Sequence, residues 1–448
     1  MIEYLWLALR KQWEKSIGKR ERPAMISLKK LAADGLIKLT DARRKYTIDG
    51  VQRLEAIYRI PLKYLYYNNQ NGRISTALQK YVSGHPEVVL NPALDDENPE
   101  YNDLFESFIF KSNEQRMKAT QESISDRGQE EPGVVLDDGR VIDGNRRFTA
   151  LRRIQKSKGI EQYFEAAILD FDITNSVDKK TIKQLELDLQ MGKEDRQDYD
   201  PIDRIFDVYN TVYVEKIMTP QEYAKSIGKE RARGINNDIK EAKLISSYLE
   251  FIGAPRDAYY IAKELRLDGP MNEVRRVLDK NKLLDDGEVK SAVFALLSMH
   301  YSGTDANEGG DITRLIRKEL QSMVSKKDDW VCLTEDNVDT IYDAFQDTPV
   351  SDASQISQIL NSSEGIKAAS NDFMRSSRRL GKMNEYRGEL QKVVETVSAC
   401  VESLESIDTA TLESLTVEQS KDVAADLEKI GMIVRKDYDV LSQTGNLL

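Results

Sequence analysis

The sequence has few of the residues on which several classes of site depend. Its 448 residues include two cysteines, Cys332 and Cys400, and two histidines, His85 and His300. Two cysteines exclude a disulfide scaffold and a cysteine-cluster zinc site, and two distant histidines argue against histidine-rich metal chemistry and HNH-type nuclease chemistry. No apolar run approaches the ~18 residues of a membrane span, and no secretory signal opens the chain. We therefore expect a cytoplasmic protein with no membrane contact and no metal site of its own.

Basic residues are the scarcer of the two charged classes. Lys and Arg number 65 against 76 for Asp and Glu, which gives a net charge of −11. A coat for non-specific nucleic-acid binding would be basic, because phosphate contacts need cations. The charge is unevenly distributed, however. Residues 140–158 contain seven basic side chains and one acid, whereas residues 401–448 contain ten acids and four bases.

Hydrophobic and turn patterns predict an α+β chain, with a small α/β unit followed by a mostly helical remainder. Residues 1–52 have a helical pattern, and Asp137-Asp-Gly139 is a hairpin turn in which Gly139 suits a positive φ. The predicted strands are 57–65 (broken at Pro61), 134–136, 141–142 and 164–171, and the predicted helices in this unit are 105–126 and 146–156. From residue 181 the pattern is almost wholly helical, and Asp200-Pro201 is a good helix start.

Near the C-terminus the apolar residues follow a heptad seam. The seam consists of Leu390, Val394, Val397, Val401 and Leu404. About three heptads is a marginal length for a coiled coil. A helix buried inside a bundle and a dimeric coiled coil are therefore both open.

The most distinctive segment is Val141-Ile-Asp-Gly-Asn-Arg-Arg-Phe-Thr-Ala-Leu151, in which a strand, a glycine turn and a helix start follow one another. Arg146 and Arg147 fall in the first helical turn, where the helix dipole already places about half a positive charge. Acidic residues would suit these positions better. A bound phosphate would explain the arginines, because backbone N–H groups and guanidinium groups would converge on it, and Gly144 would let the backbone approach. The alternative is a basic surface helix that pairs with the acidic tail.

This segment belongs to a set of motifs that resembles a known family. Gln121-Glu-Ser-Ile-Ser-Asp-Arg-Gly-Gln129, Pro132-Gly-Val-Val135 and Asp143-Gly-Asn-Arg-Arg147 are similar to the N-terminal domain of ParB, the chromosome-partition protein, in the ParB/sulfiredoxin superfamily. Asn71-Gly72-Arg73 stands in the place of that family's first phosphate motif. Arg196-Gln-Asp-Tyr-Asp-Pro201 resembles the end of its third motif. The resemblance covers about residues 55–250.

The resemblance implies a pocket for a nucleoside triphosphate, which in ParB is CTP with Mg²⁺. The residues that it implies for nucleotide binding are Arg73, Gly144, Asn145, Arg146, Arg147 and Arg196. Two departures matter. Asn145 replaces the family's glutamate, and Gly192-Lys193 stands where a Glu-Asn pair is expected. These groups serve the metal and hydrolysis in the family, so binding is better supported than turnover and no catalytic residue is assigned.

The Asp-Gly-Asn-Arg-Arg form also resembles a motif of related NTPase domains in phage-restriction and phosphorothioate-defence proteins. An NTPase or nuclease acting in phage defence or plasmid maintenance is therefore the alternative function. A sulfiredoxin activity is not expected, because no cysteine lies near the turn. A third possibility is an interaction protein whose α/β domain has lost its ligand.

Residues 218–242 have the pattern of a helix-turn-helix. Thr219 and Glu222 form a capping box, Gly228 makes the turn, and the second helix is expected to open over 229–237. Arg and Asn side chains suit guanine and adenine edges. The residues expected to contact DNA are Thr219, Lys229, Arg231, Arg233, Asn236, Asn237 and Lys240. ParB-like proteins carry such a motif directly after their third phosphate motif, as this chain does.

Together these observations predict five domains and a function. The domains are an N-terminal helical extension (1–52), a ParB/sulfiredoxin-like nucleotide-binding domain (53–180), a helix-turn-helix domain (181–268), a helical domain (269–365) and a C-terminal helical or coiled-coil segment (366–448). The expected protein binds DNA and nucleotide and forms a homodimer through its C-terminal helices.

Overall fold

The computed structural model describes residues 26–48, 50–69, 72–86, 88, 90, 92, 99–191, 200–302 and 312–443. Contacts divide the chain into two compact units, Met1–Ser376 and Ser377–Leu448. The helix predicted at the start of the chain lies outside the described residues. Among the residues that the structure describes, no helix combines the length and apolar character that a membrane span requires.

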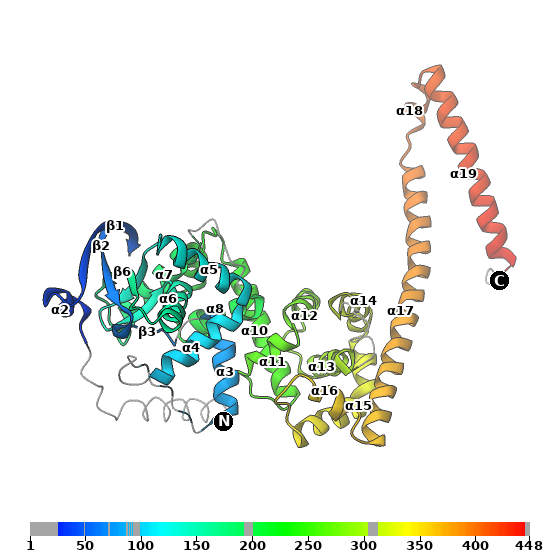
Figure 1. The fold of residues 1–448 in the computed structure, drawn as a ribbon. Helices are drawn as coiled ribbons and strands as arrows, with labels where there is room; N and C mark the ends of the chain where they lie inside the picture. The colour runs from blue at the N-terminus through cyan, green and yellow to red at the C-terminus, as the bar shows by residue number, and fades with distance from the viewer. Residues whose placement is uncertain are drawn as a thin grey trace. The chain divides into compact units, whose positions relative to one another are not determined.

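The first unit begins with a six-stranded mixed sheet, which confirms the α+β class (Figure 1). The strand order is β1-β2-β6-β4-β5-β3. The strands are β1 (Lys38–Ile48), β2 (Val51–Pro61), β3 (Tyr66–Tyr67), β4 (Gly133–Leu136), β5 (Arg140–Asp143) and β6 (Tyr163–Leu169). β3 pairs with β5 and β4 with β6 in parallel, and the other neighbours are antiparallel.

Helices cover both faces of this sheet. They are α4 (Pro99–Ser112), α5 (Glu114–Arg127), α6 (Asn145–Lys158) and α7 (Ser176–Met191). On one face Phe105 of α4 and Phe148 of α6 pack with Phe164 of β6 in one buried cluster. On the other face Ile182 and Leu185 of α7 pack in a second cluster with side chains of β1, β2, β4, β5 and β6. The result is a three-layer α/β arrangement, in which burial of apolar surface is the main stabilising term.

Local signals placed several elements correctly. β2 ends at Pro61 and continues into a 3₁₀ turn, η1 (Leu62–Tyr64). The β4–β5 hairpin turns at Gly139, whose φ is 93°. Asp200 caps α8 (Pro201–Val208) by accepting hydrogen bonds from the N–H groups of Ile202 and Asp203.

Two secondary-structure predictions were wrong. The helical pattern expected through residue 52 holds for α2 (Leu28–Ala33), but Lys38–Ile48 is strand β1. The charged residues 43–45 have no strand preference of their own. The strand forms because the side chains of Tyr46 and Ile48, two residues apart, both pack against α7, and this burial fixes the register of pairing with β2. The helix expected over 105–126 is broken at Asn113, whose side chain accepts a hydrogen bond from the Arg116 N–H at 3.0 Å and so caps α5.

The rest of the first unit is helical, as predicted. Its elements are η2 (Gly72–Ile74), α3 (Ser75–Gly84), a π-helical segment η3 (Tyr209–Val214), α9 (Pro220–Ser226), α10 (Arg233–Phe251), α11 (Tyr259–Glu264), α12 (Asp268–Lys280), α13 (Gly287–Ser302), α14 (Ile312–Val324), α15 (Lys327–Asp347) and α16 (Gln355–Leu360). Trp330, at the start of α15, is fully buried, so apolar packing extends through this helical part.

The second unit consists of long helices with uncovered apolar side chains. α17 (Glu364–Glu405) enters it from the first unit, and α18 (Thr409–Glu413) and α19 (Val417–Gln443) follow. Every member of the predicted heptad seam is exposed, from Leu404 at 37% to Val394 and Val397 at 58%. The seam is therefore uncovered among the described residues, and the dimeric coiled coil stays a prediction.

Candidate functional site

The glycine turn before α6 has a backbone that requires glycine. Gly144 is the N-cap of α6 and has a left-handed φ of 95°. A Cβ atom at this position would lie 2.8 Å from Cζ of Phe164 and 2.9 Å from Nη2 of Arg147. The first turn of α6 contains no acidic residue. Gly144 therefore allows a left-handed backbone and a close approach of the Phe164 ring, and its approach to a phosphate ligand stays a prediction.

The Arg147 guanidinium folds back over this turn. Its Nη2 donates to Oδ2 of Asp143 at 3.1 Å and to the carbonyl oxygen of Pro132 at 3.4 Å. Two other polar atoms at the helix start are buried without a hydrogen-bond partner in the described structure, namely Nε of Arg147 and Oδ1 of Asn145. A buried donor and a buried acceptor thus remain unsatisfied at one helix N-terminus, where each costs free energy unless a ligand pairs with it.

The basic surplus counted over residues 140–158 is partly offset by acids from elsewhere in the fold. Arg152, only 4% exposed, donates to Oε2 of Glu106 at 3.1 Å and to Oδ1 of Asp103 at 2.8 Å. Lys156 contacts the same two carboxylates at 3.0 and 2.7 Å. Arg153 lies 3.7 Å from Glu106. Three of the seven cations therefore hold α6 against α4 and do not form a free phosphate surface.

The pairing between α4 and α6 was not foreseen from the sequence. Asp103 and Glu106 are three residues apart on α4, while Arg152 and Lys156 are four apart on α6. Both spacings place their side chains on one face of a helix. The complementary spacing was the available signal, but it identifies partners only once the two helices are known to pack together.

The other implied phosphate residues are only partly placed. The backbone of Arg73 lies in η2, but its side chain and all of Arg196 fall outside the described residues. The loop that leads toward η2 is held from β5. Arg140 donates to the side-chain oxygens of Asn68 and Asn69 at 3.3 and 3.0 Å and lies 3.7 Å from Asp138. Arg140 is 8% exposed, so it orders this loop from within the core.

The start of α9 has the capping box that the sequence predicted. The hydroxyl of Thr219 accepts a hydrogen bond from the Glu222 N–H, and Glu222 accepts one from the Thr219 N–H at 2.8 Å. Lys180 donates to Oε1 of Glu222 at 2.6 Å. The hydrogen bond from Lys180, together with those from Thr219, lowers the pKa of Glu222 to about 2. Thr219 is therefore engaged in holding the helix start.

A short connection, residues 227–232, separates α9 from α10. Gly228, at φ 71°, makes the turn, and α10 begins at Arg233. Lys229 and Arg231 were expected inside the second helix but lie in the connection before it. Ala224 of α9 and Ile235 of α10 are fully buried members of one cluster, so the two helices pack closely.

The first turn of α10 presents polar side chains outward. Arg233 and Asn236 are exposed and Asn237 is half-buried. Residues 227 and 232, the two ends of the connection before α10, are half-buried as well. Lys240, one turn further on, donates to both carboxylate oxygens of Asp279 at 2.8 Å. Thr219 and Lys240, two of the seven residues predicted to contact DNA, thus bind other side chains of the protein. The five that stay candidates for DNA contact are Lys229, Arg231, Arg233, Asn236 and Asn237.

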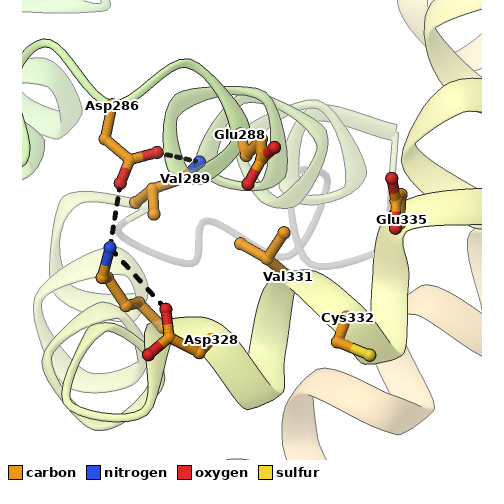
Figure 2. Close-up of a pocket in the computed structure, with 8 residues that line it drawn as sticks. Asp286, Glu288, Val289, Asp328, Val331, Cys332 and Glu335 are labelled. Atoms are coloured by element: carbon orange, nitrogen blue, oxygen red, sulfur yellow. Dashed lines mark hydrogen bonds and ion pairs between the residues drawn. The ribbon is translucent and has the colours of Figure 1, made fainter.

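Two hollows lie in the helical part of the first unit. One, of about 290 Å³, lies between the start of α13 and α15, where Lys327 bridges Asp286 and Asp328 (Figure 2). None of the predicted site residues lines it. The other, of about 510 Å³, lies beside α9 and is lined by Lys180, Tyr213 and Thr219 among others. Among the described residues, no cluster of histidine, cysteine or acidic side chains is arranged to hold a metal ion.

Comparison with known proteins found likenesses among solved structures. No family model matches the chain, and no curated protein matches it in sequence. A solved structure described as a Pnob8-like ParB-N domain, in a C2221 form, is similar, with 11% sequence identity and a TM-score of 0.30. The match covers 65% of this chain and 98% of that one.

Proposed function

We propose that this chain is a ParB-like protein that binds DNA through α9 and α10 and binds a nucleoside triphosphate, CTP by preference, at the start of α6. The observation that carries the proposal is the exposed first turn of α10. Arg233 and Asn236 point away from the buried Ile235, directly after a tight turn and a capped helix. The N-terminal residues of a recognition helix are those that contact base edges.

The chemistry of these side chains supports DNA as the partner. Arginine pairs with the O6 and N7 acceptors of guanine, and asparagine pairs with adenine. Lys229 and Arg231 are exposed on the approach to the helix and suit backbone phosphates. The overall net charge of −11 makes a non-specific coat implausible and favours a local contact of this kind.

The start of α6 supports a phosphate ligand. A phosphate oxygen would pair with the buried Nε of Arg147, which has no other hydrogen-bond partner among the described residues. Asp143 and Oδ1 of Asn145 are the oxygen donors suited to Mg²⁺, which commonly arrives with substrate phosphates. When bound, Mg²⁺ would neutralise phosphate charge. Asp143 and Asn145 would hold the ion, and Arg147, which donates to Asp143 in this structure, would face the phosphate.

The second unit supports a homodimer. Its exposed heptad seam on α17 is the feature that a second copy of the chain would cover in a coiled coil. A partition or plasmid-maintenance role in the cytoplasm fits such a dimer. An NTPase or nuclease of phage defence remains the alternative, and it requires a residue that activates water. Asn145, an amide, does not supply one.

Nucleotide binding is tested by a thermal-shift screen of CTP, ATP, GTP and UTP with Mg²⁺. Arg147→Ala is expected to weaken nucleotide binding about ten- to hundredfold, since a hydrogen bond to a charged group contributes ~1.5–3 kcal/mol. Arg153→Ala, on the same helix and with the same change in charge, is the matched control. Equal affinity in the Arg147 variant and wild type would refute the pocket.

DNA binding is tested separately by gel shift. Arg233→Ala is expected to weaken DNA binding and to leave nucleotide affinity unchanged, because the two sites share no residue. Full DNA affinity in this variant would rule out α10 as the recognition helix. Release of phosphate from the triphosphate, or cleavage of the DNA, that disappears in Arg146→Ala would favour the enzyme alternative.

A further inference from the structure

Near its turn, the β1–β2 hairpin has one face that is largely exposed among the described residues. Across it, Arg43 pairs with Ala56, Lys45 with Leu54, and Thr47 with Gln52. Partners in an antiparallel ladder share a face of the sheet, so these side chains form one row. Five of the six are exposed and Ala56 is half-buried. We call this row the ribbon face; it lies at the free edge of the sheet, because β1 is the outermost strand (Figure 1).

The opposite face of the same hairpin is partly covered. Tyr46 and Ile48 of β1 are buried in the cluster that α7 completes. Arg44, on that side, donates to Oε2 of Glu131 at 2.6 Å. On the ribbon face, by contrast, neither Arg43 nor Lys45 has an ion-pair partner within the described part of the chain. The two faces therefore differ over residues 43–48: on one, Tyr46 and Ile48 are buried and Arg44 is paired, and on the other Arg43 and Lys45 are exposed cations.

The composition of the ribbon face suits a nucleic acid. Residues 38–61 contain six basic and three acidic side chains in a chain whose net charge is −11. Arg and Lys recognise guanine or phosphate, Gln recognises adenine, and Thr contacts thymine. The major groove of B-form DNA admits a two-stranded β-ribbon, whereas the deep, narrow major groove of RNA does not admit side chains. Double-stranded DNA is thus the partner with complementary charge and shape.

We propose that the ribbon face is a second DNA contact, separate from α10, in which Arg43, Lys45, Thr47 and Gln52 enter the major groove. This inference rests on the proposed DNA-binding function, and it adds a surface on the α/β part of the chain. Leu54, 57% exposed at the centre of the row, would contact a thymine methyl group. A competing account is that the cations only protect a free sheet edge from pairing with other chains.

The experiment compares two double variants of the full chain on a short mixed-sequence DNA duplex, titrated over a series of salt concentrations. Arg43→Gln with Lys45→Gln removes both cations of the ribbon face. Lys38→Gln with Arg53→Gln removes two exposed cations from the opposite face of the same hairpin and is the matched control. We expect the first pair to weaken binding about tenfold and to lower the salt slope by about 1 to 2, and the control to change both far less.

Each outcome decides the proposal. Equal loss of DNA affinity in the two double variants would mean that only overall charge matters. Unchanged DNA affinity with increased aggregation would mean that the cations only protect the sheet edge from pairing with other chains. Either result overturns the ribbon contact. Arg233→Ala, measured alongside, separates this proposal from the previous one. Loss of binding in the ribbon variant alone supports the ribbon and rejects α10, and loss in Arg233→Ala alone does the reverse. A wild-type chain that does not bind the duplex overturns both.

Discussion

Replacing Gly144 by alanine should destabilise α6 by two separable effects. The first is conformational, because a left-handed backbone costs a residue with a Cβ about 1–2 kcal/mol. The second is steric. The new Cβ would lie 2.8 Å from Cζ of Phe164, a ring that is fully buried and cannot retreat without disturbing the core. Crowding of this kind costs about 1–3 kcal/mol, so the total should be about 2–5 kcal/mol.

The other end of α6 supplies the control. Gly159 also has a left-handed φ, 65°, but a Cβ there would meet no atom within 4 Å. Gly159→Ala should therefore cost only the conformational part, about 1–2 kcal/mol. Native-state hydrogen exchange on α6 peptides measures both, since a chain of this size need not unfold in one step. If the two variants were equally destabilised, the proposed crowding against Phe164 would be wrong.

Three further predictions concern charge and backbone. Arg152→Met should lower the Tm strongly, since breaking a buried ion pair costs about 3–5 kcal/mol. Lys156→Met is the control, because Lys156 is half-exposed and its loss should cost ~1 kcal/mol or less. Similar losses of stability in the two variants would mean that Arg152 is not the main partner of Glu106. Burial, and next the nearby negative charge of Asp238, raises the pKa of the Glu241 carboxyl to about 8. The folded protein therefore loses stability as pH rises from about 4.5 toward 8, and Glu241→Gln should raise the Tm at pH 7.5 but not at pH 4.5. An equal shift in Tm at both pH values would contradict this prediction. Lys282, exposed at φ 59°, should tolerate glycine with a gain in unfolding free energy of up to ~1 kcal/mol, and a lower Tm would show that its side chain makes a stabilising contact.

The elements predicted from sequence are those with strong local signals. Gly139 fixes the β4–β5 hairpin, Asp200 and Pro201 fix the start of α8, and Thr219 with Glu222 fixes α9. In each case the residue that ends or begins the element also makes the hydrogen bond or adopts the φ angle responsible for it. Such features do not depend on the rest of the fold.

The errors occur where distant residues decide the structure. Residues 43–45 become strand because neighbouring side chains pack on α7, more than 130 residues later. The charge of α6 is partly offset by Asp103 and Glu106, which only tertiary packing brings close. Lys229 and Arg231 have good helix propensity, yet α10 begins at Arg233, the point from which Ile235 can pack with Ala224. Propensity is a weak guide when burial favours another register.

The continuity of α10 has a mechanical consequence. Its 19 residues extend for about 28 Å at ~1.5 Å per residue, and its distal half carries Ile245, Tyr248 and Leu249, all fully buried among neighbouring helices. Because α10 is one continuous helix, a change in its tilt at Arg233 also moves its buried distal half. A displacement of its first turn would therefore disturb the packing around Tyr248.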